Sequence, residues 1–152
     1  ISASFQALRA DGEIIIINLD AIEKEFGFHE VIIKEATKSL SVIEEKELVD
    51  NIDSLKELVS DVRFARKLTK VARNSPVIRL GIPNESIIAF AKNYPLTKKR
   101  MKYNDSQTKF HLDTKVSKNL LIKILNDDLL TSELTKLYYD SLAKDDIIVE
   151  EE

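Results

Sequence analysis

Lysine and arginine side chains are concentrated in the middle of the chain, where they could bind the phosphates of a polyanion. Residues 62–123 hold fifteen lysines and arginines against three acidic residues, a net charge of +12. Residues 1–61 carry a net charge of −8 and residues 124–152 one of −7, so the whole chain has only −3. Because clustered like charges repel each other, this segregation indicates that the middle of the chain meets something anionic.

Two groups of these cations are expected to contact nucleic acid. One group lies on one face of a helix predicted over 62–73, and the other lies on a basic hairpin predicted after it. Cations at this density neutralise backbone phosphates and release counterions whatever the base sequence, so we expect binding that is dominated by the DNA backbone. The predicted nucleic-acid-binding residues are Arg63, Arg66, Lys67, Lys70, Arg73, Lys98, Lys99, Arg100, Lys102 and Lys109.

Two aspartates and a lysine offer a different chemistry. Asp105, followed by Asp113-Thr114-Lys115, has the pattern Asp…(Asp/Glu)-x-Lys of metal-dependent nucleases. In those enzymes the carboxylates hold Mg²⁺ and the lysine orients or activates the attacking water. Aspartate also bonds to local backbone in turns and caps helices, and both sites fit that explanation. The sequence therefore favours a binding protein over an enzyme, and we assign no catalytic residue, metal ligand or cofactor.

A protein-interaction module is the remaining hypothesis. Its basic face would dock on an acidic partner or on an upstream half of the same protein. This hypothesis predicts salt-sensitive oligomerisation, including a homo-oligomer, without retention on a DNA column. The charge distribution alone does not separate it from nucleic-acid binding.

The composition limits the remaining classes. With 152 residues, 43% of them hydrophobic, the chain is expected to form one compact domain over 1–144, followed by an acidic tail over 145–152. There is no cysteine, and the two histidines, His29 and His111, have no metal-ligand spacing, so disulfides, thiol catalysis and Cys/His zinc sites are excluded. Because the chain starts at Ile1 without an initiator methionine, we expect a fragment of a longer protein.

The hydrophobic spacing predicts an α+β fold that is mainly helical. An N-terminal β-hairpin is expected around Asp11-Gly12, and its four isoleucines, residues 14–17, should be buried on both faces. A short helix should open at Asp20. Residues 62–112 have the order helix, short helix, helix, hairpin, which is that of a winged helix. Two C-terminal helices follow, over 116–125 and from Thr131 onward.

Several runs of the sequence resemble a known family. They are Asn74-Ser75-Pro76-Val77, Leu112-Asp113-Thr114-Lys115 and Leu125-Asn126-Asp127-Asp128-Leu129-Leu130-Thr131-Ser132-Glu133-Leu134-Thr135, followed by Tyr138-Tyr139. The chain resembles a bacterial domain-of-unknown-function family that includes the B component of the Kiwa anti-phage defence system. The resemblance implies the C-terminal half of a cytoplasmic, DNA-binding effector. It also implies membrane association through a membrane-embedded defence partner. No site residue is carried over from the family.

Overall fold

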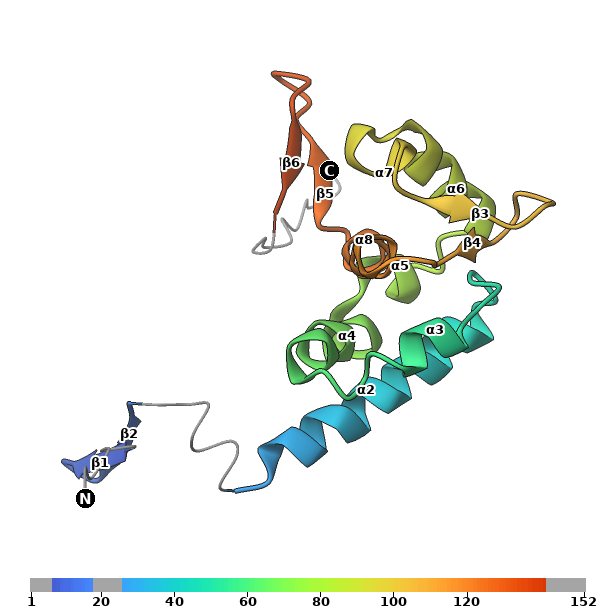
Figure 1. Ribbon diagram of the computed structural model, residues 1–152. Coiled ribbons are helices and arrows are strands. Elements are labelled where there is room, and N and C mark those ends of the chain that lie inside the picture. The colour runs from blue at the N-terminus through green and yellow to red at the C-terminus, as the bar shows by residue number, and fades with distance from the viewer. Residues whose placement is uncertain (1–6, 18–25, 142–152) are drawn as a thin grey trace.

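Two helices that pack side by side form one layer of the fold. The computed structural model describes residues 7–17 and 26–141. Helices α2 (Phe28–Glu45) and α4 (Val62–Asn74) lie against each other, with the short helix α3 (Asp53–Lys56) between them in the chain (Figure 1). The Asp61 side chain accepts hydrogen bonds from the backbone N–H groups of Arg63 and Phe64 and so caps the first turn of α4. The helix predicted over 62–73 is confirmed.

The central segment keeps the predicted order but contains an additional helix. It comprises α4, α5 (Pro76–Arg79), α6 (Asn84–Asn93), α7 (Pro95–Lys98) and a hairpin of β3 (Lys102–Tyr103) with β4 (Phe110–His111). Helix α7 forms because Pro95 is preorganised for the first helical turn and the buried Thr97 hydroxyl donates to the carbonyl oxygens of Ala91 and Tyr94. Lys98, Lys99 and Arg100 therefore lie in and after a helix, and the strands have only two residues each. The winged-helix interpretation stays a prediction.

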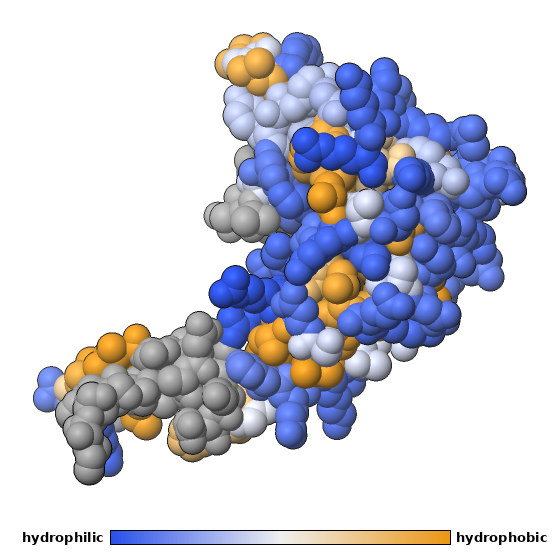
Figure 2. All heavy atoms as spheres, in the orientation of Figure 1, coloured by the Kyte–Doolittle hydropathy of each residue, from blue (hydrophilic) through white to orange (hydrophobic). Residues whose placement is uncertain are grey.

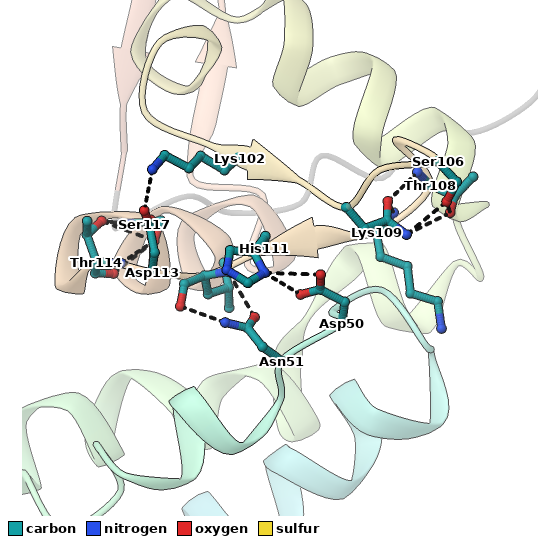
Figure 3. A network of polar contacts seen from close by, with 12 residues as sticks. Asp50, Asn51, Lys102, Ser106, Thr108, Lys109, His111, Asp113, Thr114 and Ser117 are labelled. Atoms are coloured by element: carbon teal, nitrogen blue, oxygen red, sulfur yellow. Dashed lines mark hydrogen bonds and ion pairs between the residues drawn. The ribbon is translucent and has the colours of Figure 1, made fainter.

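The β3–β4 hairpin is fixed to the segment that precedes α3. The backbone N–H of Phe110 donates to Leu48 (2.9 Å), and the N–H of Asp50 donates to the carbonyl of Phe110 (3.1 Å). The Asn51 side chain bonds to both the N–H and the carbonyl of Leu112, at 2.9 and 3.0 Å (Figure 3). These bonds, with one isolated parallel bridge between Val49 and Phe110, hold residues 48–51 beside β4 and so fix the base of the hairpin.

Helix α8 (Lys115–Leu125) lies in the middle of the molecule. Thr114 and Ser117 form a capping box at its start, and its buried residues include Leu121 and Leu125. In Figure 1 it is seen end-on, between α4 and the group made by α6, α7 and the hairpin. The buried Ser75 hydroxyl bonds to the carbonyl of Leu125 and ties the α4–α5 junction to the end of α8. The first predicted C-terminal helix is confirmed.

The second predicted C-terminal helix is wrong. Strands β5 (Leu129–Thr131) and β6 (Tyr138–Asp140) pair antiparallel instead, with Leu129 opposite Asp140. Lys136 adopts a left-handed backbone conformation, φ 56°, in the connecting turn. The hydroxyl of Tyr94 lies 3.1 and 2.9 Å from the carbonyl oxygens of Leu130 and Tyr139. This contact with two strands stabilises a hairpin that the helical spacing of the leucines does not indicate.

The N-terminal hairpin forms as predicted but leaves its isoleucines exposed. Strands β1 (Ala7–Ala10) and β2 (Glu13–Ile16) pair around Asp11 and Gly12, whose φ angles of 51° and 85° suit a tight hairpin turn. Ile14 is 72% exposed and Ile17 56%, and Figure 2 shows the hairpin as a hydrophobic surface away from the helices. The cover expected for these side chains is not among the described residues.

The remaining predicted elements are a short helix and an acidic tail. The short helix expected from Asp20 and the acidic tail over 145–152 lie outside the described residues. Among the helices of 7–17 and 26–141, none combines the length and apolar character that crossing a membrane requires. The α+β, mainly helical class is confirmed.

Candidate nucleic-acid interface

The five cations of α4 point to different neighbours. Lys67 Nζ donates to Asn119 Oδ1 on α8 at 3.1 Å, and Lys70 lines the same surface. Arg73, one turn after Lys70, reaches toward α2 instead, where its guanidinium pairs with Glu35 at 3.1 Å. Arg63 is exposed and Arg66 is half-buried. The predicted basic stripe therefore divides, and its Lys67–Lys70 part borders α8.

The predicted hairpin cations also separate. Lys98, Lys99 and Arg100 are exposed at the end of α7, and Arg100 lines a hollow against α8. Lys102 Nζ lies 2.6 Å from Asp113 Oδ2 just before α8. Lys109 lies toward the loop end of the hairpin, away from Lys102 and Asp113 (Figure 3). Arg100 therefore borders α8, as Lys67 and Lys70 do.

Two adjoining hollows on α8 bring cations from three elements together. One has a volume of about 190 Å³ and the other about 440 Å³, and Asn119 and Lys123 line both. We call the two hollows together the α8 groove. Its cations are Lys67 and Lys70 from α4, Arg100 from the end of α7, and Lys115 and Lys123 from α8. Its apolar lining is Leu96, Val116, Leu120 and Ile122.

Three groove residues of α8 were not predicted as binding residues. Lys115, Asn119 and Lys123 recur every four residues, so they lie along one face of the helix. This spacing is visible in the sequence and was the available signal. In the sequence, this spacing is masked by the Asp-x-Lys pattern at Lys115 and by the apolar face of the same helix.

Carboxylates occupy part of the groove. Lys115 Nζ lies 3.1 Å from Asp61 Oδ2, Lys123 pairs with Asp140, and Asp128 lines the first hollow. The hydrogen bond from Lys115, followed by the N–H of Phe64, lowers the pKa of the Asp61 carboxyl. The hydrogen bond from Lys102 likewise lowers the pKa of Asp113. Both carboxylates therefore stay ionised near neutral pH, and cations still outnumber acids along the groove.

The Lys115–Asp61 pair predicts a specific dependence of stability on pH. Because the pKa of Asp61 is lowered in the folded state, the ionised carboxylate stabilises the fold fully at pH values above its unfolded-state pKa. This stabilisation is lost as the pH falls below about 4 and through the lowered folded-state pKa. Asp61→Asn keeps a capping side chain but removes the charge. We expect it to melt below the parent at pH 7, with a difference that shrinks toward pH 3. Thermal unfolding at several pH values measures this.

The Lys115→Met background is the control for the pH experiment. Without the ammonium group, the effect of Asp61→Asn on the melting temperature should depend less on pH, and the remaining dependence comes from the N–H groups of Phe64 and Arg63, which also lower the pKa of Asp61. A pH dependence of the same size in both backgrounds would show that Lys115 does not contribute to it.

The nuclease pattern is spread along the β3–β4 hairpin. Tyr103 pairs with Phe110 and Lys102 with His111, so Asp105 lies beyond one end of the strand pair and Asp113 beyond the other. At about 3.3 Å per residue, this register separates the two carboxylates by well over 10 Å. Lys115, the third member, bonds to Asp61. In the part of the chain that the structure describes, no group of three or more His, Cys, Asp or Glu side chains is arranged to hold a metal.

Comparisons with known proteins place the chain in a family. The model of the family "Kiwa protein KwaB-like" matches residues 1–135. Kiwa protein KwaB of Escherichia coli O55:H7 (strain RM12579 / EPEC) is 32% identical over 133 residues, which are 88% of this chain and 42% of that protein. The chain thus spans less than half the length of this curated relative. No solved structure matches it. The chain belongs to the Kiwa protein KwaB-like family.

Proposed function

We propose that the α8 groove binds the sugar–phosphate backbone of nucleic acid, as part of an anti-phage defence protein. The observation that carries the proposal is the meeting of five cations from three elements on one open surface. Three of them, Lys67, Lys70 and Arg100, belong to the set predicted from the sequence. The defence role follows from the family, and proteins of the same system would be its partners.

The surroundings of the groove favour binding without sequence preference. In a winged helix the element corresponding to α6 would enter the major groove. Here Ile87, Ile88 and Ala91 of α6 are buried in the core, and Lys92 Nζ donates to Gln107 at 2.8 Å and lies over the Tyr103 ring. α6 thus has few polar groups to offer to base edges. Lysine and arginine contacts to phosphates carry no sequence information of their own.

The salt dependence of DNA binding tests the proposal. If the five groove cations engage duplex phosphates, log K should fall against log salt with a slope of about −4.5, and of about −7 if three neighbouring cations join them. Single-stranded DNA should give a shallower slope, because its charge density is lower. Fluorescence-anisotropy titrations with labelled duplex and single strands at several salt concentrations measure both slopes. Absence of binding to either form at low salt would contradict the proposal.

Docking of an acidic protein segment is the second candidate function. It is favoured by Asp61 and Asp140, whose carboxylates already lie against Lys115 and Lys123 of the groove. A groove that accepts the carboxylates of its own chain can accept those of another protein. This function predicts oligomerisation that salt reverses, with no retention on a DNA column.

A further inference from the structure

Near its end, the described part of the chain places a carboxylate at the α8 groove. Asp140, the last residue of β6, lines the larger hollow and pairs with Lys123. The backbone N–H of the next residue, Ser141, donates to the carbonyl of Asp128 at 2.7 Å, and Asp128 lines the smaller hollow. Residues 142–152 therefore continue the chain from a point that is held at the groove itself.

The composition of this continuation complements the groove. Residues 142–152 contain one basic residue, Lys144, and five acidic ones, with Ile147-Ile148-Val149 between the acidic pair and the acidic run. The groove has a cationic rim and an apolar floor that includes Val116, which is 49% exposed. Acidic side chains would meet the rim, and the three aliphatic residues would cover the floor.

We propose that residues 142–152 dock in the α8 groove of the same chain and compete there with nucleic acid. The competition rests on the proposed function, whereas the docking does not. Eleven residues reach at most about 36 Å when extended, and an eleven-residue helix is about 16 Å long, so the segment can run along all of α8. The carboxylates of Asp140 and its continuation would then occupy the positions of phosphates.

Because residues 142–152 are covalently attached beside the groove, even weak docking would fill the groove much of the time. A short flexible connection gives an effective concentration of about 1 mM. A segment with an intrinsic Kd of about 0.1 mM would then fill the groove roughly 90% of the time, and the apparent affinity for DNA would fall about tenfold. The segment would thus lower the affinity for every DNA by the same factor, so that tight complexes still form at concentrations where weak, non-specific ones no longer do.

A spin label tests the docking without DNA. The chain has no cysteine, so Ile148→Cys gives a single attachment site in the otherwise unchanged chain. We expect paramagnetic broadening of the backbone amide signals of Lys115, Asn119 and Lys123, and none at Thr37 on α2. The broadening should disappear in high salt and when the five acids are neutralised to Asn or Gln. Absent or uniform broadening would overturn the docking.

A mixed sample separates the same chain from a second copy. Isotope-labelled chains without the spin label are combined with spin-labelled chains that carry no isotope. Docking within one chain predicts no broadening in this mixture. Broadening of the groove signals would mean that the segment of a second copy fills the groove, and it would overturn the proposal.

DNA titration tests the competition. The variant Asp145→Asn, Asp146→Asn, Glu150→Gln, Glu151→Gln and Glu152→Gln should bind duplex about tenfold more tightly than the parent at low salt. A matched variant neutralises five exposed acids away from the groove: Glu13, Glu30, Glu45, Glu47 and Glu57. This control should gain much less affinity. Equal gains would attribute the effect to net charge and overturn the competition.

The two tests fail in different ways. Broadening confined to the groove, with no DNA binding by any variant, would leave the docking in place and remove the nucleic-acid function. DNA binding by the parent and the neutralised variant with equal affinity, and without groove broadening, would leave the nucleic-acid function in place and remove the docking.

Discussion

Reversing the charges of Lys67 and Lys70 should weaken duplex binding at least about 100-fold near 0.1 M salt. With a slope of about −0.9 per phosphate contact, each contact contributes roughly eightfold through counterion release at this salt concentration. Loss of two contacts gives roughly 60-fold, and the two introduced glutamates repel phosphates in addition. The salt slope should become shallower by about 2. Anisotropy titrations of Lys67→Glu/Lys70→Glu measure both effects.

A variant with the same charge change controls for net charge. Lys34 is exposed on α2, and Lys109 lies toward the loop end of the β3–β4 hairpin, so neither lines the α8 groove. Lys34→Glu/Lys109→Glu should keep the affinity within about tenfold and the salt slope nearly unchanged. Equal losses in the two double variants would show that only the overall field of the protein matters. The groove would then not be the site.

Phe110→Ala should lower the free energy of unfolding by about 3–5 kcal/mol. Phe110 is fully buried, and its ring centroid lies 5.5 Å from that of Tyr103. Its backbone also carries the bonds that hold residues 48–51 beside β4. A cavity here would loosen the hairpin and the segment that joins α2 to α3. Urea denaturation followed by circular dichroism gives the difference.

Phe28→Ala is the matched control for Phe110→Ala. It removes the same side chain at the start of α2, where Phe28 is 46% exposed and contacts only Phe26 among the described rings. It should lower the free energy of unfolding by about 1 kcal/mol or less. Similar losses in the two variants would mean that the β3–β4 hairpin does not belong to the cooperative core.

The elements that the sequence predicts well are those determined by neighbouring residues. Asp61 caps α4, Ser75 and Pro76 start α5, and Thr114 caps α8, and each of these signals acts within three residues. The β1–β2 turn at Asp11-Gly12 is equally local. These signals identify helix starts and turns without any knowledge of tertiary packing.

The elements that depend on distant contacts were not predictable in the same way. Leu134, Leu137 and Tyr138 have helical spacing, but the strand pair there is held by Tyr94, which is 36 residues from Leu130. The folded chain also leaves these three side chains exposed. Secondary-structure propensity does not include such a contact, because the contact forms only when α6 and the β5–β6 hairpin pack together.

The candidate site could likewise be predicted only in part, because some of its features depend on contacts between distant segments. Charge counting identified the basic region and three of the five groove cations, Lys67, Lys70 and Arg100. It also included Arg73, which pairs with Glu35, because one face of a helix does not reveal which neighbour packs beside it, and Lys109, which lies toward the loop end of the β3–β4 hairpin. The role of α8 as the floor of the groove follows only from its packing against α4 and from the hollow that its side chains line together with Leu96 and Arg100.

Mapping the DNA contact surface tests the central claim most directly. The chain is labelled with ¹⁵N and its amide signals are followed while a short duplex is added at low salt. Binding in the α8 groove predicts that the first and largest shifts occur at Lys67, Lys70, Arg100, Asn119 and Lys123. Shifts that spare these residues and concentrate on α2 or the N-terminal hairpin would contradict it, as would a spectrum that DNA leaves unchanged.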